Sequence, residues 1–186
     1  MIFNYIGSYS LIISVIISLI IFFLSISSLQ KINIQKRINL NKLNFFQFFF
    51  VLVSFFSLVI LFVLSEFSNI TVFNNSHTTK SLFYKISGTW GNHEGSLLLW
   101  LLILTFFIFL YFLNSKSRSI KERLLTLIFQ EVIIIGFLIF LLKTSNPFNQ
   151  IFPIPKQGLG LNPILQDPIL AIHPPVLYLG YVSTSI

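Results

Sequence analysis

Residues 96–113 read SLLLWLLILTFFIFLYFL, a run without a single charged side chain. A helix of this length rises about 27 Å, which is close to the thickness of the hydrocarbon core of a bilayer. Backbone N–H and C=O groups in lipid must find their partners within the same segment, so the run is expected to be a transmembrane helix. This stretch indicates the fold class, because the rest of the chain contains further apolar runs of similar length.

Three further apolar runs have the length of a membrane span. They cover residues 5–29, 45–64 and 124–142. A fifth run begins at Pro174 and reaches Ile186, and this partial span, 174–186, is too short to cross a membrane. We therefore predict a single membrane domain, all-α, with four complete transmembrane helices and the start of a fifth. The unfinished helix favours one piece of a split protein, completed by another chain, over a helix that stops partway across.

The composition supports lipid as the solvent. Hydrophobic residues make up 55% of the chain and charged residues only 9%, whereas soluble domains carry about 25% charged residues. The net charge of +7 does not indicate nucleic-acid binding, because the basic residues gather in two short loops. Without cysteine, the chain has no disulfide and no thiolate-bound metal. The abundance of Phe, Ile, Asn and Lys suggests an AT-rich genome such as that of an organelle.

The loops alternate in charge along the chain. Loop 30–44 holds four basic residues and no acidic one, and loop 114–123 holds four basic residues against Glu122. The positive-inside rule places these two loops in the matrix or cytoplasm. The N-terminus and the longer loops 65–95 and 143–173 are then expected on the outer side.

The two outer loops and their borders contain all three histidines and all seven prolines. The prolines lie between Pro147 and Pro175, and each restrains its own backbone and that of the preceding residue. We expect this loop to be stiff and extended, a surface suited to holding a partner.

His173 is the candidate ligand that stands out in this loop, because Pro174 and Pro175 follow it. Proline is favoured in the first helical turn, so His173 is expected at or just before a helix N-cap at the outer membrane boundary. From the residues alone, two interpretations stay open. A neutral imidazole there could be an axial ligand of haem iron, or it could be an interfacial histidine that merely caps the helix.

The segment 88–95 reads GTWGNHEG and precedes the third span. Asn92 is expected to cap the helix, and Glu94 lies where a carboxylate suits the helix dipole. Trp90 fits an interfacial anchor, and His93 with Glu94 is too small a set for a metal site. A polar platform and a purely structural turn both remain open here.

Glu131 lies near the middle of the fourth span, beside Gln130. A carboxyl group at that depth is costly and suggests a function by default. It is expected to be protonated or to face a polar partner on another helix, unless Gln130 and Glu131 are simply a polar pair tolerated at a helix interface.

Four segments occur in an order that resembles one known family. They are residues 89–100 (TWGNHEGSLLLW), 144–148 (TSNPF), 161–168 (LNPILQDP) and 172–182 (IHPPVLYLGYV). Together they resemble the CcmF family, the haem lyase subunit of cytochrome c maturation, densely from about residue 87 onward.

The resemblance implies that His173 is one of two outer-face haem ligands. The family's Trp-rich haem-binding segment and its second outer ligand match nothing in this chain, so haem ligation would be shared with a missing C-terminal portion. Trp90, His93 and Glu94 would form an outer-face platform that contacts haem, the chaperone or apocytochrome. The implied activity is attachment of haem to the two thiols of a Cys-x-x-Cys-His motif on apocytochrome c, and this chain would not be active alone.

The implied partners are the remaining CcmF polypeptides, the haem chaperone CcmE, a CcmH-type apocytochrome-binding protein, apocytochrome c and the lipid bilayer, with no nucleic acid. The expected location is the mitochondrial inner membrane, or a bacterial inner membrane if the chain is not organellar. Two competing hypotheses are a membrane subunit of an ion-translocating or transport complex, and a structural subunit without haem ligation.

Overall fold

The computed structural model describes residues 1–30 and 39–185. Within them the regular structure is helical, apart from one antiparallel bridge between Asn69 and Gln150. The α-helices are α1 (Ile2–Gln30), α2 (Leu40–Leu64), α3 (Ile70–Asn75), α4 (Leu82–Gly88), α5 (His93–Asn114), α6 (Ile120–Lys143) and α7 (Pro168–Ser183). Short 3₁₀ turns form η2 (Ser115–Ser117) and η3 (Pro163–Gln166).

Four of these helices are long and apolar enough to cross a membrane: α1, α2, α5 extended through Ser117, and α6. The predicted all-α class with four complete spans is thereby confirmed. Most of loop 30–44, with Lys31, Lys36 and Arg37, lies outside the described residues, as does Ile186 at the end of the partial span.

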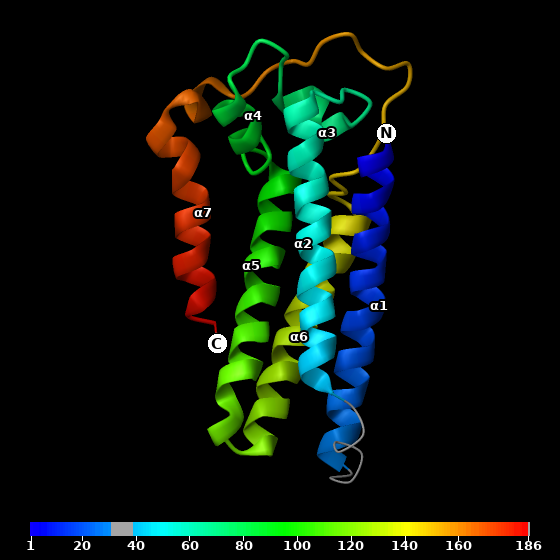
Figure 1. Ribbon diagram of the computed structural model, residues 1–186, viewed down its shortest axis with the longest axis vertical. Coiled ribbons are helices and arrows are strands. Elements are labelled where there is room, and N and C mark those ends of the chain that lie inside the picture. The colour runs from blue at the N-terminus through cyan, green and yellow to red at the C-terminus, as the bar shows by residue number, and fades with distance from the viewer. Residues whose placement is uncertain (31–38, 186) are drawn as a thin grey trace.

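The four long helices stand side by side as a bundle (Figure 1). Helix α1 packs against α2 and α6, α2 against α5, and α5 against α6. Helix α7 lies at the edge of the bundle, where its main neighbour is α5. The two ends of the bundle differ, and we call them the cap end and the basic end.

The cap end carries α3, α4 and the segment 144–167, which runs across the top of the bundle to α7 (Figure 1). This segment is held by backbone hydrogen bonds to the stretch before and within α3. Ile151 N–H donates to Ser68 C=O at 2.9 Å, and Leu159 N–H donates to Phe73 C=O at 2.8 Å. The stiffness expected from the prolines is therefore supported by pairing with a second segment.

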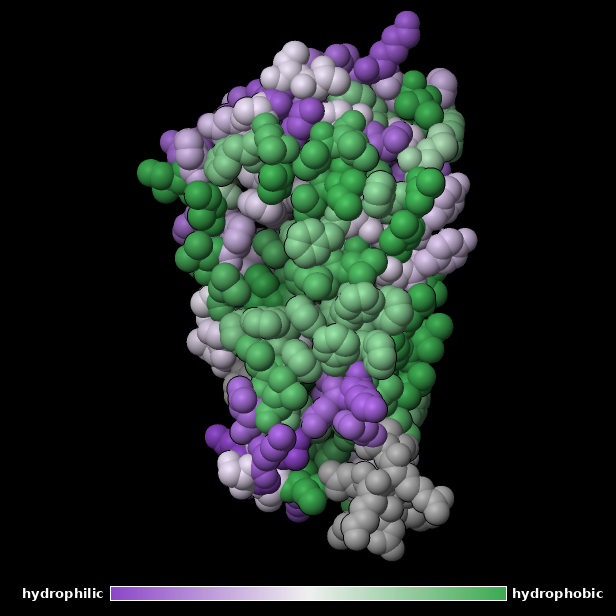
Figure 2. Space-filling view, viewed as in Figure 1, coloured by the Kyte–Doolittle hydropathy of each residue, from purple (hydrophilic) through white to green (hydrophobic). Residues whose placement is uncertain are grey.

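The basic end carries the positive side chains of the described parts of loops 30–44 and 114–123. They are Lys42, Lys116, Arg118, Lys121 and Arg123. Figure 2 shows hydrophilic residues at both ends and a hydrophobic band between them. That distribution fits a bundle whose middle faces hydrocarbon and whose ends face water.

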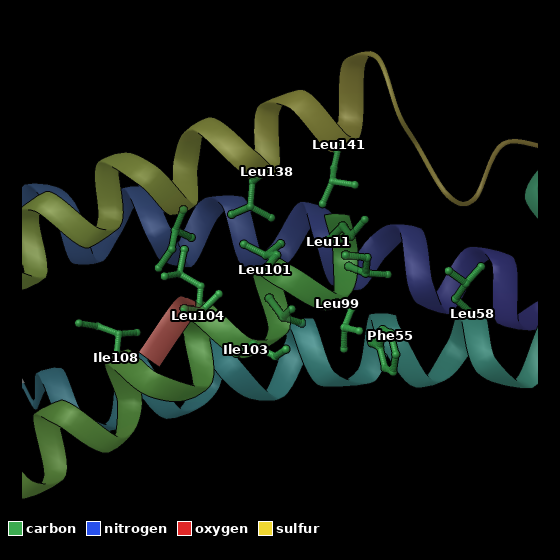
Figure 3. Packing of buried hydrophobic residues seen from close by; sticks show 14 of the residues in the cluster. Leu11, Phe55, Leu58, Leu99, Leu101, Ile103, Leu104, Ile108, Leu138 and Leu141 are labelled. Atoms are coloured by element: carbon green, nitrogen blue, oxygen red, sulfur yellow. The ribbon is translucent and has the colours of Figure 1, made fainter. Parts of the chain in front are cut away.

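Leucines from different helices fill the centre of the bundle. Leu11 of α1, Leu101 of α5 and Leu138 of α6 are fully buried and point toward one another (Figure 3). Leu58 of α2 is also fully buried. Since lipid is as apolar as leucine, such packing holds helices together by close contact more than by exclusion of water.

Polar residues cap the long helices at their N-termini. Asn92 Oδ1 accepts from Gly95 N–H at 2.7 Å at the start of α5, which confirms the cap predicted there. Ser119 Oγ accepts from Glu122 N–H at 3.2 Å at the start of α6. The caps let these helices begin a few residues before the apolar runs do.

The expected position of His173 at a helix N-cap is wrong. Helix α7 begins at Pro168, and Asp167 is the cap, with its Oδ1 accepting from Ile169 N–H at 2.8 Å. Pro168 occupies the first helical turn, where proline is favoured, so the Pro174–Pro175 pair lies inside the helix. His173 is consequently in the second turn.

Candidate functional site

An indole compensates for the prolines inside α7. In a regular helix the N–H of residue 175 would donate to the carbonyl of residue 171, but Pro175 has no N–H. The Ala171 carbonyl accepts instead from Trp90 Nε1–H at 2.8 Å. Trp90 lies just before α5, so this bond joins the TWGNHEG segment to the helix that carries His173.

A second aromatic contact fixes α7 further along. Trp100 of α5 stacks on Tyr178 of α7, with ring centroids 5.5 Å apart and an interplanar angle of 26°. Trp100 also contacts Phe137 of α6, at 5.6 Å between centroids. Trp100 thus links three helices.

The segment before α7 is tied to α4 and the turn preceding it. Tyr84 O–H donates to the Gln166 carbonyl at 2.5 Å, and Lys80 Nζ donates to Gln166 Oε1 at 2.7 Å. Gln166 Nε2 donates in turn to the Leu161 carbonyl at 2.9 Å. Hydrogen bonds therefore fix the LNPILQDP segment both through its backbone and through the Gln166 side chain.

His93 connects α5 to the segment that follows α6. Its Nδ1 lies 3.2 Å from Ser145 Oγ, and its ring meets the edge of Phe140 at 6.1 Å between centroids. Glu94 is partly buried in the first turn of α5, where the positive end of the helix dipole favours a carboxylate. The structure thus brings Trp90 into contact with α7, and His93 into contact with the segment that follows α6.

His173 lies on a different side of α7. The buried residues Ala171 and Val182 and the stacked Tyr178 mark the face turned to α5. Residue 173 is about 200° around the helix from residue 171, so His173 faces away from α5. It is exposed, and so are its helical neighbours Ile169 and Val176.

This environment fits one axial ligand of a haem. An exposed imidazole can present a ring nitrogen to iron, and the apolar Ile169 and Val176 on either side suit a porphyrin face. Among the described residues no three His, Cys, Asp or Glu side chains come together as a metal site. His173 is thus the candidate iron ligand on this exposed face of α7, whereas Trp90 bonds to the Ala171 carbonyl on the face turned to α5.

Glu131 is fully buried and has partners on two other helices. Ser18 of α1 donates a short hydrogen bond to Glu131 Oε2, and Gln47 Nε2 of α2 donates to the same oxygen at 2.9 Å. The predicted polar partner on another helix is confirmed. The neighbouring Gln130 has a different partner. Its Nε2 donates to the carbonyl of Ser185, just after the end of α7, at 2.6 Å.

The partners of Glu131 were not singled out from the sequence. A signal existed, because Ser14, Ser18 and Ser25 recur at helical spacing in the first span, and Asn44 and Gln47 are three residues apart. Such spacing puts polar groups on one buried helix face. It does not say which helix they meet.

These features define a multi-pass helical membrane protein whose polar cap braces a proline-interrupted helix. A family model described as "Cytochrome C assembly protein" matches residues 90–186, just over half of the chain. The chain belongs to this cytochrome c assembly family.

Curated relatives carry related names. The chain is 38% identical over 181 residues to the cytochrome c-type biogenesis protein CcmF of Haemophilus influenzae. The alignment covers 97% of this chain and 28% of that protein. The chain is 50% identical over 139 residues to the cytochrome c-type biogenesis protein CycK of Rhizobium meliloti, over 75% of this chain and 21% of that protein. The chain thus spans between about a fifth and under a third of these relatives.

A solved structure shares the fold. The cytochrome c heme lyase CcmF aligns with a TM-score of 0.82 at 23% identity, over 99% of this chain and 29% of that one. The resemblance to CcmF seen in the four sequence segments is confirmed.

Proposed function

We propose that this chain is one part of a cytochrome c haem lyase, in which α7 offers His173 as an axial ligand to haem that is being attached to apocytochrome c. The observation that carries the proposal is the Trp90–Ala171 bond, because it joins two of the recognised segments and braces the helix that bears His173. The names of the relatives support cytochrome c maturation as the process.

The chain's own contribution to the reaction is binding and orientation. His173 would bind the iron, and Ile169 and Val176 would provide apolar contacts to the bound haem. When bound, haem supplies the vinyl carbons to which the apocytochrome thiols add. The His173 imidazole, bound to the iron, would limit its other chemistry. The thiols belong to the substrate, in keeping with the absence of cysteine from this chain.

We assign the second ligand to the part of the relatives' length that residues 1–186 do not span. The proposed assembly includes the remaining CcmF polypeptides, the haem chaperone CcmE, a CcmH-type protein and apocytochrome c. Trp90, His93 and Glu94 serve it as a platform that holds α5, α7 and the segment after α6 in register.

We place the cap end on the outer side of the membrane, where cytochrome c receives its haem, and the basic end in the matrix or cytoplasm. The positive side chains of the basic end support this orientation. The composition supports the mitochondrial inner membrane, with a bacterial inner membrane as the alternative.

The test is co-purification of the chain with its other pieces, followed by haem absorption spectra of His173→Ala. We expect lost or altered haem binding and loss of cytochrome c maturation. His77→Ala is the matched control, since His77 is a cap-end histidine that pairs locally with Thr79. If His173→Ala leaves both the haem spectra and cytochrome c maturation unchanged, ligation by His173 is contradicted and the structural-subunit hypothesis is favoured.

The ion-translocating alternative rests on Glu131, whose side chain bridges three helices. It predicts that Glu131→Gln abolishes proton-coupled or ion-coupled transport while haem binding survives. If the chain is instead part of a haem lyase, His173→Ala should reduce cytochrome c maturation more than Glu131→Gln does.

A further inference from the structure

The interior of the bundle holds a polar site that haem ligation at α7 does not use. Glu131 of α6, Ser18 of α1, and Gln47 and Asn44 of α2 are all fully buried. Asn44 lies one turn from Gln47 toward the basic end, where α2 begins. Ser18 and Gln47 contact Glu131, and Asn44 lies beyond Gln47 on the same face of α2, toward that end.

The hydrogen bonds of Glu131 are unevenly distributed between its two oxygens. Ser18 and Gln47 both donate to Oε2, whereas the buried Oε1 has no partner among residues 1–30 and 39–185. This is the arrangement of a neutral carboxylic acid, in which the carbonyl oxygen accepts twice and the hydroxyl oxygen still needs an acceptor. Both recorded donors are uncharged groups, which agrees with the high cost of an isolated charge at this depth.

Further buried atoms lie on the same face of α2 as the Gln47 donor. Among the residues that the structure describes, Gln47 Oε1 and both Asn44 Nδ2 and Oδ1 have no hydrogen-bond partner. Each such atom left unpaired costs about 1–3 kcal/mol, so a site with four of them is expected to bind something. The set offers both a donor and acceptors. A cation would need acceptors alone and an anion would need donors alone, but water uses both.

Other charged or titratable groups on the surrounding helices lie toward the helix ends. They are Tyr5 and Tyr9 on α1, Lys42 on α2, His93, Glu94 and Tyr111 on α5, and Lys121, Glu122, Arg123 and Lys143 on α6. None is a recorded hydrogen-bond partner of Glu131 among the described residues. The site is thus suited to a neutral ligand.

We propose that Asn44, Gln47 and Glu131 bind water inside the bundle, and that this water exchanges the carboxyl proton of Glu131 with solution at the basic end. In the exchange, Glu131 Oε1–H gives its proton to the bound water and receives one back, so no charge is left in the hydrocarbon. Ser18 and Gln47 keep the carbonyl oxygen fixed while this happens.

Infrared spectroscopy of the full chain in lipid tests the proposal. The difference between wild type and Glu131→Gln should contain the C=O band of a protonated carboxylic acid. Transfer to D₂O should shift that band while the protein stays folded. Glutamine can accept the same two hydrogen bonds through its amide oxygen, so the variant is expected to fold.

Asn44→Leu should slow the deuterium shift by about tenfold, the factor that corresponds to losing one ordinary hydrogen bond along the route. Ser25→Ala is the matched control, because Ser25 Oγ donates to the Ile21 carbonyl of its own helix. A carboxylate band instead of an acid band, a band that shifts only on unfolding, or equal exchange rates in Asn44→Leu and wild type would each overturn the proposal.

Discussion

At the scale of single residues, Trp90 replaces a hydrogen bond that α7 lacks. Pro175 has no N–H to donate to the Ala171 carbonyl, and the Trp90 indole donates to it instead. Trp90→Phe keeps an aromatic ring but removes the donor, leaving a buried carbonyl without a partner. We expect a loss of about 1–2 kcal/mol in the free energy of unfolding, with weaker haem retention although His173 is intact. Thermal unfolding and haem titration measure the two effects.

Pro175→Ala makes this prediction sharper. Alanine restores an N–H that can donate to the Ala171 carbonyl within α7, so Trp90 becomes dispensable. In a double-mutant cycle, Trp90→Phe should cost clearly less in the Pro175→Ala background than in wild type. Additive effects of the two substitutions would contradict the assigned role of the indole.

Glu66 gives a pH dependence at the cap end. The Ser68 hydroxyl lowers the pKa of Glu66 below its ordinary value of 4.5, burial opposes this, and the Met1 ammonium, 3.1 Å away, adds to the lowering. The ionised form therefore stabilises the folded chain above pH 4.5, and this stabilisation disappears as the pH falls through the folded-state pKa.

Because Glu66 is partly exposed, the effect should stay below about 1 kcal/mol. Wild type should unfold at a slightly higher temperature than Glu66→Gln at neutral pH, and the two should converge in acid. A difference that persists unchanged in acid would show that ionisation of Glu66 is not its source.

At the scale of elements, Gly95 lets α5 begin where it does. A Cβ at this position would collide with the Thr89 carbonyl, which is backbone and cannot swing aside. Gly95→Ala should therefore displace the turn that carries Trp90 and the Asn92 cap, at a cost of about 2 kcal/mol or more.

Gly136 in α6 is the matched control, since a Cβ there meets nothing within 4 Å. Gly136→Ala should be neutral or stabilising by up to about 1 kcal/mol, because alanine favours a helix. Circular dichroism during thermal unfolding in lipid or detergent compares the two. Equal stability of the variants would contradict the close approach at Gly95.

The helices themselves were predictable because their signal is local. Residues 96–113 form most of α5 simply because an uncharged run of that length has no other favourable state in lipid. The start of α7 was missed because two prolines at 174–175 competed with Pro168 for the first turn. The Trp90 indole replaces the hydrogen bond that Pro175 removes inside the helix, and packing between distant segments is not a local property of sequence.

The candidate site divides in the same way. The resemblance identified His173, and residue spacing identified Asn92 as a cap, since both depend on neighbours in sequence. Ser18 and Gln47 lie on separate helices from Glu131, so their convergence depends on how α1, α2 and α6 associate. Loop charge cannot supply that information.

At the scale of the whole molecule, the orientation of the bundle can be measured directly. The chain has no cysteine, so single cysteines can be introduced without background. Asn74→Cys at the cap end and Ser117→Cys at the basic end replace exposed residues. We expect membrane-impermeant reagent to label Asn74→Cys from the outer side only and Ser117→Cys from the inner side only. The opposite pattern would reverse the proposed topology and remove His173 from the compartment of cytochrome c.

The hydroxyl groups of α1 also bear on the order in which this protein enters a membrane. Ser14, Ser25 and Ser27 bond to carbonyls of their own helix, so these hydroxyl groups are satisfied before α1 meets another helix. The carboxyl group of α6 has no such internal partner and costs about 3 kcal/mol at the centre of an isolated span. Synthesis from the N-terminus delivers Ser18 and Gln47 first. The first two helices are thereby in place to receive Glu131 when α6 leaves the insertion machinery.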